Sequence, residues 1–365
     1  MSDQHVRVGI IGVGNCARAL VEGVAYYTQN RDDTAGLMHH RVGPYLPEHV
    51  HFAAAWDVDA DKVGKDLSDA ILAGQNLDVG ITANVPHLDV PVWRGPTLDG
   101  TGDRYRERIT LADDWPNLTG AEVVEQVQAA QVDVLLNYLP VGSQDATEWW
   151  AAIALEAGCA FVNNVPVFIA RKDYWRDRFK QAGLPLIGDD IKSQYGATYI
   201  HRLLVQAFSD RGITLDRTYQ LNVGGNMDFW NMLQDSRLES KRESKTSAVT
   251  DAYRAPLTPD NVHIGPSDYV PWLGDTKRAF IRCEGRGFGG APIEMDVQLA
   301  VPDSPNSAGV VIDAARIAKL ALDAGEVDVD RYVSAWLFKA PPRVVADVPD
   351  LEAMHRIDGW LAQYA

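Results

Sequence analysis

The stretch GGNMDFWNML at residues 224–233, with two lysines shortly after it, concentrates side chains that can act on a small polar molecule. It offers the amide of Asn226, the carboxylate of Asp228 and the ammonium groups of Lys241 and Lys245. Amides and lysines donate hydrogen bonds to phosphate and hydroxyl oxygens, and a lysine can stabilise the oxyanion that forms beside a ketone. The segment therefore predicts a site for a phosphorylated, hydroxyl-rich substrate.

A second chemical signal, VRVGIIGVGNCA, lies near the start of the chain and has the GxGxxA form of a dinucleotide-binding turn. Gly12 suits the tight turn, Gly14 lets the backbone approach a pyrophosphate, and Ala17 is small enough for a helix to pack on a strand. Asn15 and Cys16 open that helix, whose positive N-terminal end attracts phosphates. We expect these five residues to bind a dinucleotide, with a glycine turn that binds nothing as the alternative.

Asp57 ends a second apolar run and is the expected ligand of the adenosine ribose hydroxyls. The usual distance from the glycine turn is about 20 residues, and an insertion at residues 28–50 explains why Asp57 lies farther away. An acidic residue with no arginine directly after it favours NAD over NADP.

Other lysines and aspartates stand beside polar turns. Asp190 and Lys192 follow an apolar run, where open α/β sheets bind ligands, so we expect them to face the nicotinamide end. Lys277 and Lys339 lie next to polar turns farther along the chain. Each lysine taken alone is also explained as a solvated surface residue, and the polar residues around Asp228 as turn or cap formers.

Alternation of short apolar runs with helix-length stretches predicts an α/β fold with a Rossmann-type, doubly wound parallel sheet. The expected strands are residues 6–13, 51–57, 132–138, 160–165 and 184–188. The expected helices are residues 16–27, 121–130, 145–157, 173–183 and 310–325. Three further strand-like segments, residues 218–223, 279–284 and 293–301, predict an antiparallel sheet in a second, α+β domain.

The chain is accordingly expected to have two domains. Residues 1–200, completed by residues 303–365, would form the NAD-binding Rossmann domain, and residues 201–302 the catalytic domain. Two loop-rich insertions, at residues 28–50 and 76–118, interrupt the first domain, and insertions of this length are usually functional.

Composition excludes several classes of protein. The net charge of −16 argues against non-specific nucleic-acid or anionic-membrane partners, and no apolar run reaches the roughly 18 residues of a membrane span. Three cysteines without paired spacing predict neither disulfides nor a thiolate metal site. No histidine spacing demands a metal, and no Ser/His/Asp arrangement supports a hydrolase. We expect a soluble, cytoplasmic protein.

With these motifs in view, the chain resembles the myo-inositol-1-phosphate synthase family, in its shorter bacterial and archaeal branch. The matching segments run in order along nearly the whole chain: GVGNCA at 12–17, GPTLDG at 95–100, YLPVGS at 138–143, GDDIKSQ at 188–194, GGNMDF at 224–229, LESK at 238–241, SKT at 244–246, HIGPSD at 263–268 and DSPNSAG at 303–309.

The resemblance implies an NAD-containing isomerase that cyclises a hexose 6-phosphate without net redox change. In the family reaction NAD⁺ takes a hydride from C5, the C6 enolate attacks the C1 aldehyde, and NADH returns the hydride to C5. The cofactor is therefore expected to stay bound through the cycle. The family also implies a homotetramer joined through the sheet of the second domain, so that residues 201–302 would serve oligomerisation as well as catalysis. Its varied metal dependence leaves a divalent metal open.

The resemblance further implies roles for individual residues. Six are implied in catalysis: Lys241, Lys245, Lys277, Lys339, Asp190 and Asp303. The cofactor would contact Gly12, Gly14, Asn15, Cys16, Ala17, Asp57, Asp190, Ser304 and Ala308. The substrate would contact Lys192, Ser193, Asn226, Met227, Asp228, Trp230 and Asn137.

Three positions depart from the side chains usual in bacterial members: Asn137, Asn164 and Trp230. They suggest a reshaped substrate pocket, and the same machinery acting on fructose 6-phosphate would close a five-membered ring. The alternatives are thus a myo-inositol phosphate synthase, a five-membered cyclitol phosphate synthase of carbocyclic nucleoside biosynthesis, an ordinary NAD-dependent sugar-phosphate dehydrogenase, and a non-catalytic NAD-binding regulator.

Overall fold

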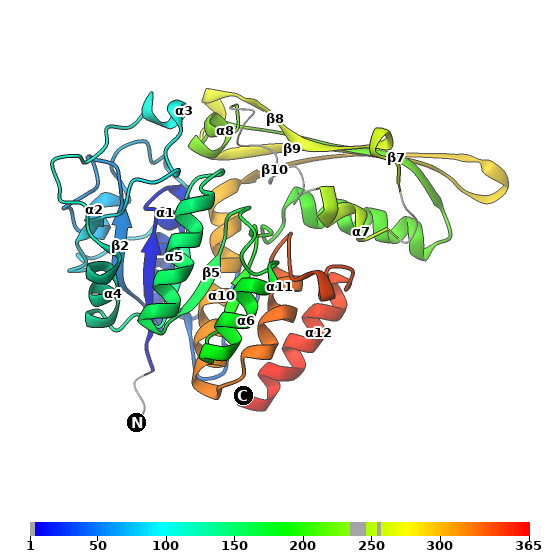
Figure 1. Ribbon diagram of the computed structural model, residues 1–365. Coiled ribbons are helices and arrows are strands. Elements are labelled where there is room, and N and C mark those ends of the chain that lie inside the picture. Colours follow the sequence, from blue (N-terminus) through cyan, green and yellow to red (C-terminus); the bar gives the residue numbers. More distant parts are fainter. Residues whose placement is uncertain (1–3, 234–245, 254–256) are drawn as a thin grey trace.

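The computed structural model describes residues 4–233, 246–253 and 257–365 (Figure 1). A six-stranded sheet, entirely parallel and ordered β3-β2-β1-β4-β5-β6, forms its centre. Its strands are β1 (Val6–Ile11), β2 (Val50–Asp57), β3 (Val92–Arg94), β4 (Val134–Asn137), β5 (Ala160–Asn163) and β6 (Leu186–Gly188). The strand order reverses between β1 and β4, which confirms the doubly wound parallel sheet.

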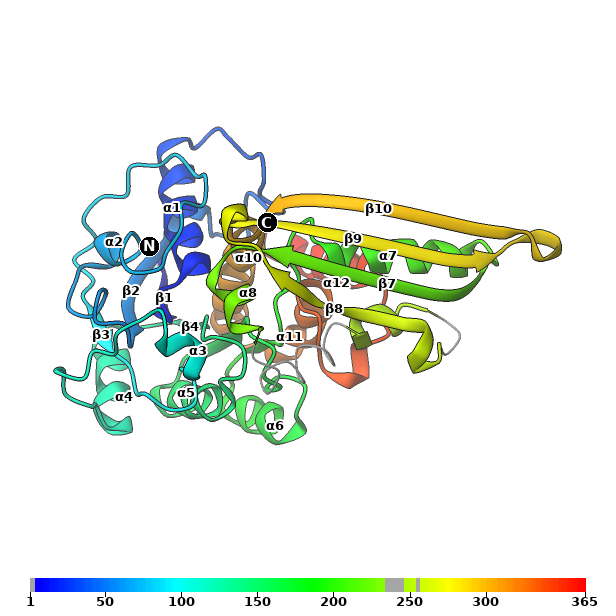
Figure 2. The ribbon, with the colours of Figure 1, turned by 90° about the horizontal axis from the view of Figure 1, so that it is seen from above.

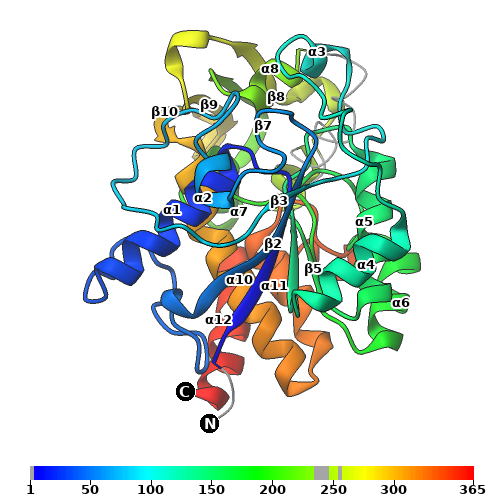
Figure 3. The same cartoon turned by 90° about the vertical axis from the view of Figure 1, so that its left-hand side faces the viewer.

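Helices cover both faces of this sheet, which is why its central strands are apolar throughout (Figure 3). On one face pack α1 (Asn15–Gln29), α10 (Asp303–Ala324), α11 (Asp330–Leu337) and α12 (Asp350–Leu361). On the other pack α4 (Gly120–Ala129), α5 (Gln144–Ala157) and α6 (Asp173–Ala182). A capping box between Thr119 and Glu122 begins α4, and left-handed Gly158 and Gly183 end α5 and α6.

The insertion at residues 76–118 contains structure that the sequence did not predict. Within it β3 joins the sheet beside β2, and the short helix α3 (Asp103–Arg106) lies near α8 (Met227–Asn231) of the second sheet region (Figure 1). Another short helix, α2 (Leu67–Ala70), precedes it. The insertion therefore reaches from the edge of the parallel sheet to the segment of residues 224–233, which contains α8.

The second sheet has four long strands in the order β10-β9-β7-β8 (Figure 2). They are β7 (Thr214–Gly224), β8 (Val262–Tyr269), β9 (Thr276–Arg286) and β10 (Pro292–Pro302). The expected antiparallel pairing holds for β7, β9 and β10, but β8 runs parallel to β7, so the sheet is mixed. A long crossover connects β7 to β8 and permits parallel pairing, whereas the short turn between β9 and β10 makes a hairpin.

Helix α7 (Ala197–Asp210) covers one face of this second sheet, with Val205 and Phe208 against Ile281 and Cys283. The chain then returns to the parallel sheet through α10, as expected, although α10 begins directly at Asp303 and not at residue 310. The exact domain limits at residues 200 and 303 stay a prediction. Short 3-10 turns occur at Pro47–His49, Pro259–Asn261, Pro271–Leu273, Phe288–Gly290, Val327–Val329, Arg343–Val345 and Ala362–Tyr364.

Across these described ranges, no helix combines the length and hydropathy that a membrane crossing needs.

A buried ion-pair cluster ties α7 to the C-terminal helix. Asp350, at the start of α12, accepts from Lys192 Nζ and, at 2.9 Å, from Arg202 Nε. Burial lowers the pKa of Lys192 to about 8, although the charge of Asp350 opposes this shift. Burial alone would raise the pKa of Asp350, but Lys192 and Arg202 hold it below its ordinary value. The cluster is therefore a structural anchor with little access to water.

We predict that Asp350→Asn lowers the free energy of unfolding by about 3–5 kcal/mol, because it leaves Arg202 buried without its counter-charge. Urea denaturation of the purified variant would measure this. Glu352→Gln is the matched control, since it makes the same acid-to-amide change in an exposed pair with Arg356 on the same helix and should change stability little. Equal effects of the two variants would contradict the anchoring role.

Candidate functional site

Two adjoining cavities, of about 190 and 90 Å³, open at the carboxyl ends of the parallel strands. They share Gly14, Lys62, Tyr105 and Tyr138, so they form one continuous site that crosses the point where the strand order reverses. Open α/β sheets bind their ligands at this edge. The smaller cavity lies beside β2, and the larger one extends between the parallel sheet and the second sheet.

The glycine turn is shaped for a phosphate group. Gly12 has φ +89°, and a Cβ there would come within 2.9 Å of the Tyr138 carbonyl oxygen, so only glycine fits. At Gly14 a Cβ would meet nothing within 4 Å, which leaves open space directly before α1. The N-terminus of α1 has no side-chain cap, so its first N–H groups are available to an anion.

Asp57 lines the smaller cavity at the end of β2. Its carboxylate accepts hydrogen bonds from the backbone N–H of Val13, at 2.7 Å, and from those of Val58 and Asp59. The buried ammonium of Lys62 lies 3.9 Å from Asp57 and donates to Asn76 at 3.1 Å. Asp57, which the sequence predicts at the ribose position, is thus held in place by the glycine turn itself.

The residues of this half fit a dinucleotide. Two buried polar atoms that line the smaller cavity, Thr101 Oγ1 and Asp59 Oδ2, have no hydrogen-bond partner within the described chain. Such atoms in a cavity are expected where a ligand completes the hydrogen bonding. Together with the open space at Gly14 and the acid at Asp57, they match the ribose and pyrophosphate of NAD.

Cys16 and Ala17 follow the turn. Burial, with the added effect of Asp303 and Asp275, raises the pKa of the Cys16 thiol to about 12. The thiol is therefore neutral and unsuited to act as a nucleophile. Ala17 is fully buried and packs in the core beneath the cavity.

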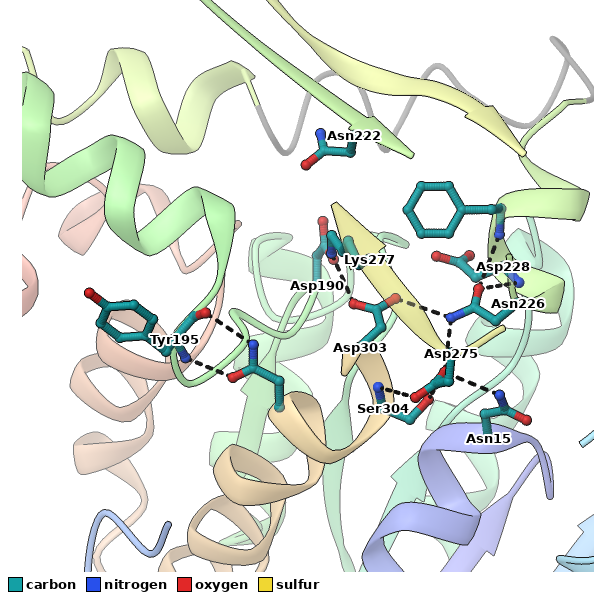
Figure 4. Close-up of polar contacts among 12 residues, drawn as sticks. Asn15, Asp190, Tyr195, Asn222, Asn226, Asp228, Asp275, Lys277, Asp303 and Ser304 are labelled. Atoms are coloured by element: carbon teal, nitrogen blue, oxygen red, sulfur yellow. Dashed lines mark hydrogen bonds and ion pairs between the residues drawn. The ribbon is translucent and has the colours of Figure 1, made fainter. Parts of the chain in front are cut away.

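Asp275 is the hub of a hydrogen-bond network that joins residues lining the larger cavity (Figure 4). Its Oδ1 accepts hydrogen bonds from Asn15 Nδ2 and Asn226 Nδ2, both at 3.2 Å, and from Ser304 Oγ at 2.7 Å. Its Oδ2 accepts from the Ser304 backbone N–H at 2.9 Å. Burial raises the pKa of Asp275, Asp303 adds to this, and these hydrogen bonds oppose it. No motif marks Asp275 in the sequence, and the prediction missed it.

Lys277 lies at the other end of this network. Its ammonium is 3.0 Å from Asp303 Oδ1, while Asp303 Oδ2 accepts from Asn226 Nδ2 at 3.2 Å (Figure 4). Burial alone lowers the pKa of Lys277, but Asp303, Asp228 and Asp190 raise it above the ordinary value. Lys277 is consequently a stable cation inside the cavity.

A second lysine–carboxylate pair faces the cavity from β6. Lys339 Nζ is 2.8 Å from Asp190 Oδ1, and the Lys339 backbone N–H donates to the Asp190 carbonyl at 2.8 Å. Asp190 has φ +60°, a left-handed conformation that aspartate tolerates better than most residues. The site therefore holds two partly buried ion pairs contributed by different parts of the chain.

Most of the predicted residues meet at this site. Twelve line the larger cavity: Gly14, Asn15, Cys16, Asp190, Ser193, Asn226, Met227, Asp228, Lys277, Asp303, Ser304 and Lys339. Gly12 and Asp57 line the smaller one. Lys241 and Lys245 lie outside the residues that the structure describes.

Four predicted ligands are placed elsewhere. Lys192 belongs to the buried cluster with Asp350, because its ammonium donates to the Ala335 carbonyl in α11 and to Asp350 at the start of α12. Asn137 is fully buried and donates to Thr147 Oγ1 and Asn163 Oδ1 beneath the cavity. Ala308 lies one turn into α10 and lines an outer groove. The fourth, Trp230, lines neither of the two cavities.

Trp230 packs outside the cavity lining, between the insertion and β8. Its indole N–H donates to the Arg104 carbonyl oxygen at 3.0 Å, and its ring lies under the guanidinium of Arg108 at 4.2 Å and edge-on to Tyr269. Its contacts therefore hold α3, and the prediction that it contacts substrate directly has no support in its position.

The insertion at residues 76–118 supplies cavity residues that sequence reasoning missed, namely Asn76, Tyr105 and Ile109, and Lys62, which precedes the insertion, is another. None of them carries a motif, and only the length of the insertion indicated a role for the first three. Asn164, noted as a departure from the family but not assigned a contact, also lines the larger cavity. Within the described ranges no group of three or more His, Cys, Asp or Glu side chains is placed to hold a metal ion.

Comparisons with known proteins identify the family of the chain. The model of the family described as myo-inositol-1-phosphate synthase matches residues 196–304. The inositol-3-phosphate synthase of Mycolicibacterium smegmatis is 54% identical over 349 residues, covering 94% of this chain and 95% of its own. That of Corynebacterium glutamicum is 50% identical over 371 residues, covering 100% of both.

Two crystal structures extend the match to three dimensions. A myo-inositol-1-phosphate synthase-related protein from Thermotoga maritima superimposes with a TM-score of 0.83 at 26% identity, over 98% of each chain. The structure of Ari2 does so with a TM-score of 0.79 at 32% identity, over 99% of each chain. The predicted fold class and the prediction of an isomerase that closes a ring are thereby confirmed. The chain belongs to the myo-inositol-1-phosphate synthase family.

Proposed function

We propose that the protein converts glucose 6-phosphate to a myo-inositol phosphate, with NAD held throughout the reaction. The observation that carries the proposal is the convergence of two lysine–carboxylate pairs, Lys277–Asp303 and Lys339–Asp190, on a cavity continuous with a dinucleotide turn. The names of relatives at 50–54% identity support the same substrate.

The chain's own residues would hold the cofactor by complementary groups. The space at Gly14 and the N-terminus of α1 suit the pyrophosphate, and Asp57 suits the adenosine ribose. When bound there, NAD supplies a hydride acceptor for C5 of the sugar and returns the hydride after the ring has closed. A redox-neutral cycle requires that the nucleotide stay in place, and the insertion residues Tyr105 and Ile109, which line both cavities, contribute to its enclosure.

The two lysines would stabilise negative charge on the substrate. Oxidation at C5 makes the C6 protons acidic, and the resulting enolate and the later alkoxide at C1 each need a cation at a fixed position. Lys277, whose pKa is raised, keeps its proton at neutral pH and so acts as an electrostatic stabiliser and not as a general base. The paired carboxylates Asp303 and Asp190 fix where each ammonium lies.

The protein is further proposed to act in the cytoplasm as a homotetramer. Helix α7 covers one face of the second sheet, while the opposite face carries partly buried apolar side chains such as Leu221, Val223 and Phe280. Multi-angle light scattering should give four times the 40.1 kDa chain mass. A mass equal to a single chain would contradict this assembly.

A five-membered product from fructose 6-phosphate is the alternative. The sequence basis for this alternative is the set Trp230, Asn137 and Asn164, and of these only Asn164 lines the larger cavity. Incubation with each hexose 6-phosphate and NMR of the product decides the ring size. We expect a six-membered ring from glucose 6-phosphate with no lasting absorbance change at about 340 nm. A five-membered ring, or stoichiometric accumulation of NADH as in a dehydrogenase, would overturn the proposal.

We also predict that Lys277→Met lowers kcat by roughly 10²–10³-fold, the usual effect of removing one group that stabilises an oxyanion. NAD affinity should be nearly unchanged, because Lys277 lies in the substrate half. Steady-state assays and nucleotide titration would measure both. Lys180→Met is the control, since its ammonium pairs with Asp328 at the surface, and it should retain full activity. Unchanged kcat in Lys277→Met would remove this lysine from the mechanism.

A further inference from the structure

Asn164 has an unsatisfied amide inside the larger cavity. It is the residue directly after β5, its side chain lines the cavity, and the residue is only 5% exposed. Neither its Nδ2 nor its Oδ1 has a hydrogen-bond partner in the described protein. Buried polar atoms are almost always paired in folded proteins, and exceptions call for a specific explanation.

The backbone fixes this amide in place. The Asn164 N–H donates to the Asn137 carbonyl at 3.2 Å, and the Asn164 carbonyl accepts from the Ile191 N–H at 3.0 Å. These bonds join the ends of β4, β5 and β6, so they hold the backbone of Asn164 in place at the sheet edge. The unsatisfied amide is therefore built into the rigid floor of the cavity.

The preceding residue shows what a structural asparagine looks like at the same place. Asn163 Nδ2 donates to the Val167 carbonyl at 2.6 Å and to Asp189 Oδ1 at 2.7 Å, and its Oδ1 accepts from Asn137 Nδ2 at 2.9 Å. Two neighbouring asparagines of equal chemistry thus differ in one respect. One is satisfied by the protein, and the other is not.

We propose that Asn164 binds a ligand group that presents a hydrogen-bond donor and an acceptor side by side. The identity of the ligand rests on the proposed function, which offers two sources of this chemistry. The carboxamide of nicotinamide would pair with the Asn164 amide through two N–H···O=C bonds, and a pair of neighbouring hexose hydroxyls could satisfy the same two atoms.

The place of Asn164 in the fold fits both sources. It follows β5, and the neighbouring strand β4 is followed by the segment 138–140, which lines both cavities. Along the sheet edge, Asp57 at the end of β2 and Asn164 at the end of β5 therefore lie on opposite sides of the glycine turn that follows β1. On the other side of Asn164 are Asp190 and Lys339. Nicotinamide and substrate must be in contact here if a hydride is to pass between them, so an amide at this point can orient either one.

The test compares Asn164→Leu with Asn163→Leu, which make the same change at adjacent positions. For protein freed of nucleotide, Asn164→Leu should leave the melting temperature unchanged or raise it, because it removes two unpaired buried atoms. Asn163→Leu should lower it, because it breaks three hydrogen bonds. A fall for Asn164→Leu as large as that for Asn163→Leu would mean a structural role and overturn the proposal.

Ligand titrations then identify the source. If the carboxamide is bound, Asn164→Leu weakens NAD binding by roughly 10-fold or more. The 3-acetylpyridine analogue of NAD lacks the amide N–H, so the wild type should bind NAD more tightly than this analogue, and the variant should show no such preference. If hydroxyls are bound, NAD affinity holds and the KM for glucose 6-phosphate rises by a similar factor. Unchanged affinity for both ligands would overturn the proposal. Failure of the wild type to form inositol phosphate would reject the proposed function alone, because the nucleotide titration does not depend on turnover.

Discussion

The hydrogen bonds to the Asp275 carboxylate are the constraint on which the site depends. They reach Asn15 at the dinucleotide turn, Asn226 at the start of α8 and Ser304 at the start of α10. A buried carboxylate must be satisfied in this way, since an unpaired one is strongly unfavourable. One side chain thereby ties the glycine turn and α10, which belong to the parallel-sheet domain, to α8, which follows β7 of the second sheet.

The distribution of charge around this hub explains how an acidic protein can serve an anionic substrate. The net charge of −16 belongs to the whole chain, but inside the larger cavity Lys277 is paired with Asp303 and Lys339 with Asp190, and Lys62 lies 3.9 Å from Asp57. The carboxylates Asp303, Asp228 and Asp190 raise the pKa of Lys277 against the lowering effect of its burial. The paired carboxylates also fix the position of each ammonium group.

The position of a residue at the end of a parallel strand also explains why polar residues of the same type have different roles. Lys192 and Lys339 both lie near the end of β6, yet one is sealed beneath the floor with Asp350 and the other faces the cavity. Asn163 and Asn164 divide in the same way. At a strand end successive side chains point to opposite sides, so a shift of one residue decides between a structural contact and a ligand contact.

Sequence alone determined the parallel sheet, the glycine turn with Asp57, the return of the chain through α10 and the family, because each rests on local patterns: runs of apolar residues, glycine spacing and short motifs. Tertiary structure alone decided that β8 runs parallel to β7, that Trp230 holds α3 and does not line the cavity, and that Lys62, Asp275 and Asn164 do line or organise it. The physical reason is the same in each case. A hydrogen bond between residues 15 and 275, or a side chain left without a partner, depends on where distant segments meet, and no spacing along the chain records that meeting.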